Sequence, residues 1–143
     1  MPDHRMTIRP YSATDEEGVV RLWQRCNLTR AQNDAHLDIA RKMGVNPELF
    51  LVGTIEGKIV ATVIGGYEGH RGWINYLGVD PDYRRRGLAR QIMSAVEDKM
   101  RAMGAPKINL QVRADNAGVV PFYEVIGYAV EDRISMGKRL VKD

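Results

Sequence analysis

A basic turn is the stretch of this sequence best suited to bind an anion. Residues 83–89 read YRRRGLA, in which three consecutive arginines are followed by Gly87 and then by apolar residues at helical spacing. A helix N-terminus offers unpaired N–H groups and a partial positive charge, and glycine has no Cβ to block a ligand. The amides of Arg85–Ala89 are therefore predicted to cradle a pyrophosphate. The alternative is a solvated basic surface.

Composition narrows the classes of protein that could hold such an anion. The 143 residues have a formal net charge of +3, and 44% of them are hydrophobic. A mild excess of charge suits a polyanionic small molecule, and aromatic residues for base stacking are not interleaved with the arginines, which argues against nucleic acid. The single cysteine, Cys26, excludes an internal disulfide and suits a reducing cytosol. No apolar run approaches the roughly 18 residues of a membrane span. We therefore expect a soluble cytoplasmic protein that needs no membrane.

The elements that must position the basic turn follow from apolar spacing. We expect one α/β domain over residues 1–143, in which an antiparallel meander precedes strand–helix–strand units. Asn33 or Asp34 would cap the second helix, with Leu37, Ile39, Ala40 and Met43 inside and Gly44 at its end. The predicted helices are 15–25, 34–43, 87–104 and 119–126, and the predicted strands are 6–10, 49–55, 59–65, 73–79, 107–112, 128–130 and 134–140.

Two motifs in this order resemble a known family. Residues 77–90, LGVDPDYRRRGLAR, resemble motif A of the GCN5-related N-acetyltransferases (GNAT), whose core is Gln/Arg-x-x-Gly-x-Gly/Ala. Arg84, Gly87 and Ala89 match that core. Residues 116–128, NAGVVPFYEVIGY, are similar to the family's second signature, Asn followed by Phe-Tyr-Glu-x-x-Gly-Phe/Tyr. The stretches GGYEGHRG and KINLQV look closest to small bacterial YpeA-like acetyltransferases.

The resemblance implies a fold and a donor. The fold would be a single GNAT domain with a mixed, mostly antiparallel sheet that splays between the fourth and fifth strands, flanked by helices on both faces. The donor would be acetyl-coenzyme A (acetyl-CoA), with its pantetheine arm paired to the fourth strand. Nothing in the residues suggests a metal, since His4 and His36 have no ligand spacing with any partner. The implied donor-binding residues are Leu77, Gly78, Val79, Arg84, Arg85, Arg86, Gly87, Leu88, Ala89, Arg90, Asn116 and Tyr123.

Transfer of an acetyl group to an amine also needs an acid and a base. Tyr123 stands at the family's acid position, and a phenol with a pKa of about 10 is protonated at neutral pH. The alternative is that Tyr123 packs in the core beside Phe122. Many family members have a glutamate at the position of Asn75. The amide of Asn75 cannot accept a proton as a carboxylate can. The base is then Glu68 or His70, in the turn YEGHRG, or a water ordered by Asn75. We favour Glu68, although this turn also suits a solvated hairpin tip.

The acceptor site is less defined by the sequence. Trp23 lines it or belongs to the core. Asn33 and Asp34 bind an acceptor ammonium or cap a helix. Glu68 and His70 are further candidates for contact with the acceptor. The acceptor itself could be a small amine or a peptide, as an N-terminus or a lysine, and the resemblance allows a homodimer.

Two hypotheses of function follow. The first is an acetyl-CoA-dependent N-acetyltransferase that works by direct transfer in a ternary complex. The alternative is an acyl-CoA-binding sensor or a catalytically inactive GNAT-like module, in which Asn75 marks lost chemistry. Tyr123 favours the enzyme, because a sensor needs no acid at the sulfur.

Overall fold

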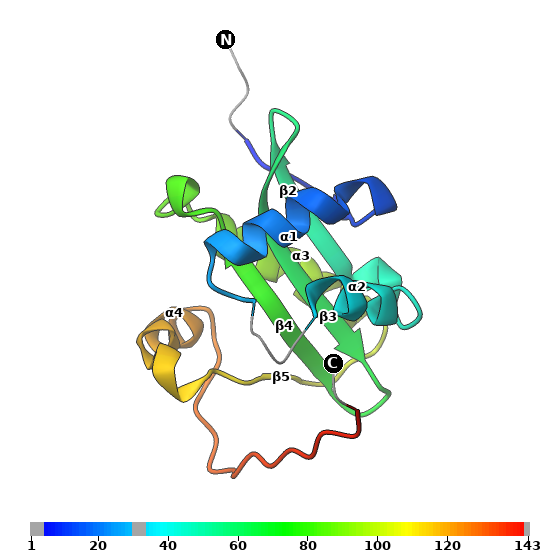
Figure 1. The fold of residues 1–143 in the computed structure, drawn as a ribbon. Coiled ribbons are helices and arrows are strands. Elements are labelled where there is room, and N and C mark those ends of the chain that lie inside the picture. Colours follow the sequence, from blue (N-terminus) through cyan, green and yellow to red (C-terminus); the bar gives the residue numbers. More distant parts are fainter. Residues whose placement is uncertain (1–4, 30–33, 142–143) are drawn as a thin grey trace. The chain divides into compact units, whose positions relative to one another are not determined.

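The computed structural model describes residues 5–29 and 34–141, which fall into two compact units (Figure 1). The first unit, Met1–Leu110, contains one sheet and three α-helices. The second unit, Gln111–Asp143, contains one short α-helix and an extended C-terminal segment. Within the described ranges no helix is both long enough and apolar enough to span a bilayer.

The sheet of the first unit has five strands in the order β1-β2-β3-β4-β5. The first four pair antiparallel, and β4 and β5 pair parallel. This confirms the predicted mixed, mostly antiparallel sheet. The hairpin between β2 and β3 turns at Glu56 and Gly57, whose φ angles of 51° and 79° suit the two-residue turn that joins twisted strands. The strands are β1 (Thr7–Pro10), β2 (Phe50–Ile55), β3 (Lys58–Tyr67), β4 (Gly72–Val79) and β5 (Ile108–Leu110).

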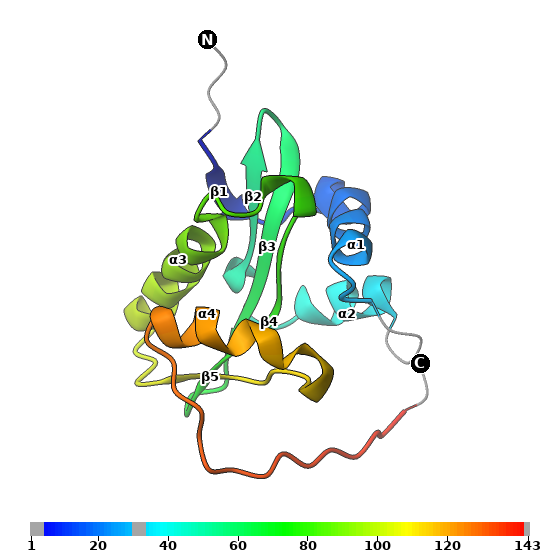
Figure 2. The same ribbon diagram turned by 90° about the vertical axis from the view of Figure 1, so that its left-hand side faces the viewer.

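Helices cover both faces of this sheet (Figure 2). Helices α1 (Glu16–Arg25) and α2 (Ala35–Lys42) lie on one face, and α3 (Leu88–Ala102) lies on the other. Two parallel strands cannot be joined by a tight turn, so α3 is the crossover that links β4 to β5. Its first residue, Leu88, is buried and packs with Ile55 and Val60, which anchors the N-terminus of α3 close to the end of β4.

Each face of the sheet buries its own apolar layer. On the α1 side, the fully buried Trp23 ring stacks on Phe50, and Phe50 stacks on Tyr11 at a centroid distance of 4.4 Å. On the α3 side, Met100 packs so closely on Gly65 and Gly72 that a Cβ at either position would lie 2.5 Å from its side chain. Glycine at these strand positions therefore lets α3 approach the sheet backbone.

The prediction for α2 needs a correction. Asp34 caps the helix, as expected, by accepting a hydrogen bond from the Leu37 N–H at 3.2 Å. However, Leu37, Ala40 and Met43 are exposed, and only Ile39 of the predicted inner residues is buried. The helix also meets the sheet through polar contacts: Lys42 Nζ donates to the Gly65 carbonyl, and Asp38 accepts the Tyr76 phenol.

The last two predicted strands are wrong. In the second unit, α4 (Val120–Val125) follows a 3₁₀ segment, Ala114–Val119, and has Pro121 in its first turn, where the missing N–H costs little. Residues 128–141 then run without strand or helix. Their apolar side chains are open, with Ile134 91% and Met136 92% exposed. An alternating pattern indicates strand propensity, but a strand also needs a ladder partner, which local sequence does not supply.

Candidate functional site

The loop between β4 and α3, residues 80–87, has the geometry of an anion cradle. Arg85 and Gly87 both adopt positive φ angles, 64° and 76°, so the chain turns sharply just before the helix. A Cβ at Gly87 would meet nothing within 4 Å. Gly87 is the N-cap and makes no side-chain cap, and the first turn of α3 contains no acidic residue. The space beside Gly87 is therefore open, and it lies at the positive end of the helix dipole, where the first N–H groups of a helix have no partner within the helix.

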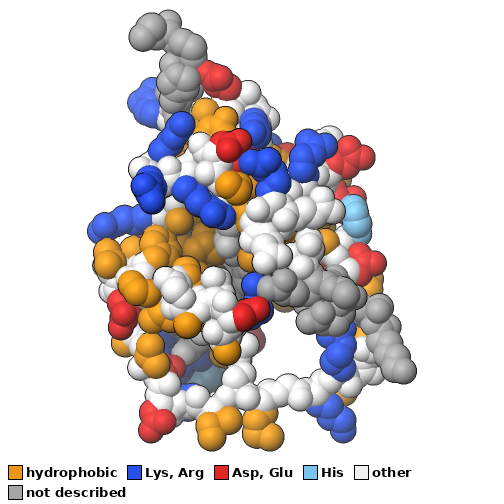
Figure 3. Space-filling model, turned by 60° about the vertical axis from the view of Figure 1, so that its left-hand side comes forward, with side chains coloured by type: hydrophobic (Ala, Val, Ile, Leu, Met, Phe, Trp, Pro, Cys, Tyr) orange, Lys and Arg blue, Asp and Glu red, His pale blue; other side chains and the backbone are white. Residues whose placement is uncertain are grey.

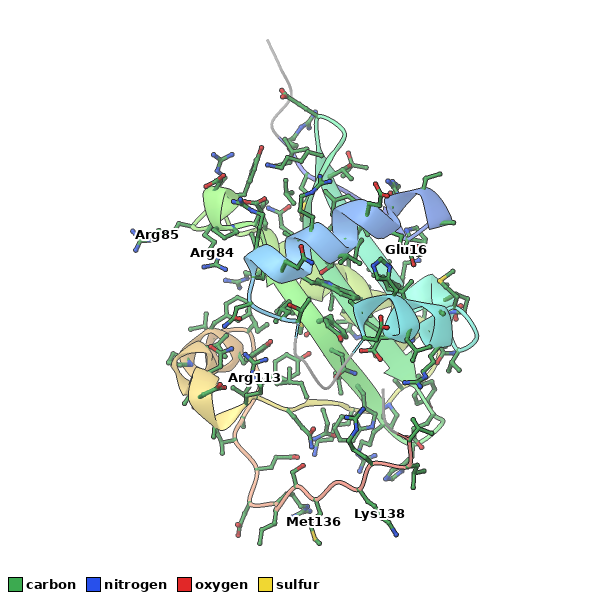
Figure 4. The ribbon with its side chains drawn as sticks, viewed as in Figure 1. Glu16, Arg84, Arg85, Arg113, Met136 and Lys138 are labelled. Atoms are coloured by element: carbon green, nitrogen blue, oxygen red, sulfur yellow. The ribbon has the colours of Figure 1, made fainter. Side chains whose placement is uncertain are left out.

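The three arginines of this loop have different roles. All three are exposed, and Figure 3 shows Lys and Arg side chains gathered on the side of the molecule from which the loop projects. Arg84 donates through Nε to the Val79 carbonyl at 3.3 Å, and Arg86 lies over the Tyr83 ring at 4.9 Å. Arg85 extends outward (Figure 4). Two arginines therefore stabilise the loop, and Arg85 reaches into solvent, where an anion would arrive.

Asp80 anchors the start of this loop. Its carboxylate is 1% exposed, accepts the Asp82 N–H at 2.9 Å and pairs with Arg25 at 3.0 Å and Lys58 at 3.6 Å. Burial alone would raise the pKa of Asp80, but these hydrogen bonds and cations outweigh it and lower the pKa. The carboxylate is therefore charged at neutral pH, and it ties α1 and the β2–β3 hairpin to the loop.

The strand before the loop has an irregular and partly free edge. Opposite the single residue Val63 of β3, strand β4 has two, Tyr76 and Leu77, and this β-bulge places Tyr76 at a φ of 53°. Strand β5 pairs only with Gly72–Ile74. Among the described residues, β4 from Asn75 onward has no strand ladder on its β5 side. This is where the family resemblance implies the splay and the donor strand Leu77–Val79.

The predicted base candidates lie at different distances from the free edge of β4, either in the turn before that strand or on the strand itself. Glu68 and His70 are in the turn before β4, and Glu68 Oε1 accepts the N–H groups of His70, at 2.8 Å, and Arg71. Roughly 15 Å of strand separates this turn from Leu77, at about 3.3 Å per residue. Asn75 is exposed on the face covered by α1, since it pairs with Ile64 of that core layer. The Glu68 carboxylate therefore closes its own turn.

The acceptor-site predictions have mixed outcomes. Trp23 is 0% exposed and stacks on Tyr76 at 3.9 Å, so it belongs to the core and its assignment to the acceptor pocket is wrong. Asp34 is the helix cap of α2. Asn33 lies outside the described residues. Cys26 is half-buried, and burial raises the pKa of its thiol, which suits an unreactive side chain.

The predicted acid and the predicted asparagine both lie in the second unit. Tyr123 is on α4 and contacts Phe122 and Tyr128 edge-to-face, at 5.2 and 5.9 Å between ring centroids. Burial raises the pKa of the Tyr123 phenol, so it remains protonated at neutral pH. Asn116 is exposed at a kink inside the 3₁₀ segment that leads to α4.

Sequence reasoning missed three residues of this region. Asp80 directly follows the predicted strand 73–79, but its role as a buried anchor has no local signal, because its partners Arg25 and Lys58 are distant in sequence. Tyr76 and Asp38 share a hydrogen bond of 2.6 Å. Neither residue shows a local signal. A tyrosine in an apolar run does not indicate a positive φ, and the partner of Asp38 is 38 residues away in sequence.

Comparison with known proteins places this geometry in a family. A model described as the acetyltransferase (GNAT) family matches residues 11–128. The chain belongs to the GNAT acetyltransferase family. An acetyltransferase of Pectobacterium atrosepticum is 49% identical to it over 138 residues, which is 96% of this chain and 98% of that protein.

Solved structures agree with this assignment. The ribosomal-protein-S18-alanine N-acetyltransferase of Escherichia coli has a TM-score of 0.73 and 27% identity, over 86% of this chain and 77% of its own. An aminoglycoside acetyltransferase, AAC(6')-Iy in complex with a CoA-containing bisubstrate analogue, has a TM-score of 0.77 at 16% identity, over 96% of this chain and 99% of its own. The latter similarity is one of fold alone.

The cradle geometry predicts the effect of adding a side chain at Gly87. Gly87→Val should raise the KM for acetyl-CoA at least tenfold, because the added atoms would occupy the open space beside Gly87, at the start of α3. Steady-state kinetics with varied acetyl-CoA, supported by calorimetric titration with CoA, measures this.

Gly57→Val is the matched control for this variant. Gly57 has a similar φ of 79° and the same open surroundings, but lies in the β2–β3 turn. It reproduces the backbone strain of a β-branched residue at positive φ and should leave this KM within about twofold. Normal CoA affinity in Gly87→Val would disprove the cradle.

Proposed function

We propose that this acetyltransferase moves an acetyl group from acetyl-CoA to a primary amine by direct transfer in a ternary complex. The observation that supports this most is the open, positive-φ Gly87 at the N-terminus of α3, directly after a strand whose edge is free from Asn75 onward. A helix N-terminus without acidic residues suits a pyrophosphate, and a free strand edge suits the amides of a pantetheine arm.

The residues present fit acetyl-CoA as the donor. The amides of Arg85–Ala89 would hold the pyrophosphate, Arg85 and Arg90 would pair with phosphate oxygens, and the Leu77–Val79 backbone would hold the arm. The bound donor would supply an acetyl thioester. The AAC(6')-Iy neighbour, which contains a CoA-derived analogue, supports the same kind of donor here.

During transfer the chain must do four things: remove a proton from the amine, stabilise the oxyanion, hold both substrates together and donate a proton to the sulfur. The acceptor nitrogen loses a proton and bonds to the carbonyl carbon, the C–S bond breaks, and the sulfur gains a proton. A backbone N–H of Leu77–Val79 would stabilise negative charge on the carbonyl oxygen. Holding both substrates on one strand edge would remove much of the entropic part of the barrier. Tyr123 would donate the proton to the sulfur. Asn116, in the segment that leads to α4, would contact the arm of the donor.

We assign removal of the amine proton to a water ordered by Asn75. Asn75 is exposed on β4 next to the free edge, whereas the Glu68 carboxylate already accepts two N–H groups of its own turn. An amide side chain orients a water through one donor and one acceptor, and the water passes the proton to solvent. This replaces Glu68, which the sequence favoured as the base.

The acceptor class needs a direct screen. The Escherichia coli neighbour is named for acetylation of an alanine of ribosomal protein S18, and the AAC(6')-Iy neighbour is named for an aminoglycoside. Acetyl-CoA turnover should therefore be measured by thiol release with peptides bearing a free N-terminus, lysine peptides, polyamines, amino acids and aminoglycosides. Thiol release with one class, and the acetylated product by mass spectrometry, is the expected result. Tight CoA binding without turnover on any amine would favour the acyl-CoA sensor.

The acid role of Tyr123 predicts a specific kinetic change. Tyr123→Phe should lower kcat by about 10²-fold, within the usual range for loss of acid catalysis, with little change in CoA affinity. Because burial holds the pKa of this phenol above its ordinary value of 10.0, the acid is present at neutral pH and is lost only as pH rises through the shifted pKa. The wild-type rate should thus fall only above pH 10.

The pH profile separates this role from packing. In Tyr123→Phe the high-pH decrease of kcat should disappear, since no phenol remains to ionise. Tyr128→Phe is a matched control, because Tyr128 contacts the Tyr123 ring and is not assigned a proton. An unchanged kcat in Tyr123→Phe, with chemistry rate-limiting, would make Tyr123 a packing residue.

The base assignment predicts a contrast between two strand positions. Asn75→Ala should lower kcat/KM for the amine about tenfold on the ascending limb of the pH profile, because its water loses an anchor. Glu68→Gln and His70→Gln should leave that limb unchanged. A strong decrease in Glu68→Gln alone, with normal CoA binding, would return the base role to Glu68.

A further inference from the structure

Tyr76 occupies a backbone conformation that its side chain disfavours. Its φ of 53° is in the left-handed region, where a bulky residue is a true outlier whose backbone strain must be offset by its surroundings. Glycine adopts this conformation without such a cost. A tyrosine at this point of β4 therefore implies that other groups hold the backbone there.

Three contacts hold Tyr76, and each acts on a different part of the residue. The ring stacks on Trp23 of α1 with centroids 3.9 Å apart and planes at 15°. The carbonyl accepts the Thr62 hydroxyl of β3 at 3.0 Å. The phenol donates to the Asp38 carboxylate of α2 at 2.6 Å. One residue is thus held from two helices and the neighbouring strand, all within the first unit.

The contact at the carbonyl is part of a longer chain of hydrogen bonds. Thr62 is 0% exposed, and its hydroxyl accepts from Trp23 Nε1 at 3.0 Å while it donates to Tyr76. The bulge leaves Tyr76 outside the regular one-to-one ladder with β3. The Tyr76 carbonyl accepts a hydrogen bond from the Thr62 hydroxyl instead. The fixed Trp23 ring is therefore oriented by the same hydroxyl that positions the bulge.

The position of the bulge connects these contacts to the reaction. It lies directly before Leu77–Val79 and directly after Asn75, on the part of β4 that β5 leaves free. A bulge changes the direction of the backbone groups that follow it. The N–H that would face the thioester oxygen and the carbonyls that would hold the arm depend on this direction.

We propose that Asp38, together with Trp23 and Thr62, acts as a positioning residue that holds the Tyr76 bulge and so aims the Leu77–Val79 backbone at the thioester. This inference rests on the proposed function. Because Asp38 is on α2, its hydrogen bond to Tyr76 links the placement of that helix to the direction of the donor strand.

Removal of either partner of that bond tests the inference. Tyr76→Phe deletes the phenol oxygen and keeps the ring, and Asp38→Ala deletes the acceptor. Each should lower kcat about tenfold, since small displacements in a preorganised site are costly. CoA affinity should stay within twofold, because the pyrophosphate cradle is separate. The double variant should be no worse than either single one, because both remove the same bond.

A matched control excludes a general effect of losing a helical carboxylate. Asp98 on α3 makes an equally short bond of 2.6 Å, to Arg101, on an exposed surface. Asp98→Ala should leave kcat unchanged. Calorimetric titration with CoA gives the number of binding sites per chain, which should stay at one in every variant. A loss of kcat matched by a loss of sites would mean a folding defect and would overturn the inference, as would unchanged kcat in both Tyr76→Phe and Asp38→Ala.

A spectroscopic measurement keeps the inference testable apart from turnover. The backbone amide resonances of Leu77, Gly78 and Val79 should shift in Tyr76→Phe and in Asp38→Ala, but not in Asp98→Ala. If the wild-type protein acetylated no amine, the proposed function would fail, while shifted resonances would still support the hold on the bulge. Unshifted resonances would refute that hold, whatever the activity.

Discussion

Parallel pairing of β4 with β5 is the constraint on which the site depends. Parallel neighbours need a crossover, and here the crossover is α3, which must begin where β4 ends. The positive end of the helix dipole is therefore placed directly after the strand. The pairing also stops after three residues, so that strand leaves an edge free beside the helix N-terminus. A helix N-terminus and a free strand edge beside it thus follow from one topological feature.

The second important feature is the use of long-range polar contacts to hold an irregular backbone. Asp80 is buried at the start of the loop, and cations from α1 and the β2–β3 hairpin keep its pKa low and its charge in place. Tyr76 is held at positive φ by groups from α1, α2 and β3. Both irregular positions flank Leu77–Val79. Preorganised backbone donors stabilise developing charge without reorganising during a reaction, and under the proposed function the strained geometry would provide such donors.

Part of this site could be predicted from local sequence. The turn before α3 was predictable because its parts are adjacent: arginines, a glycine with no Cβ, and helical spacing that begins at once. Its binding of an anion stays a prediction. The glutamate-to-asparagine difference at Asn75 was visible by resemblance. A water ordered by Asn75 was among the alternatives for the base, but the sequence could not rank it above Glu68, because the hydrogen bonds that Glu68 accepts from its own turn depend on turn geometry. Trp23 illustrates the same limit, since an indole on an amphipathic helix has the same spacing whether it faces a core or a pocket.

Sequence alone determined the elements whose signals are periodic or local: the positions of α1, α2 and α3, the β2–β3 hairpin with its glycine turn, and the turn that precedes α3. Tertiary structure decided everything that depends on a partner distant in the chain. Residues 128–141 have strand-like alternation but no ladder partner, and they remain irregular. The Tyr76 bulge exists because Val63 faces two residues and because Trp23, Thr62 and Asp38 converge on one of them. Hydrogen-bond partners and register are properties of the assembled sheet, and for that reason no local pattern records them.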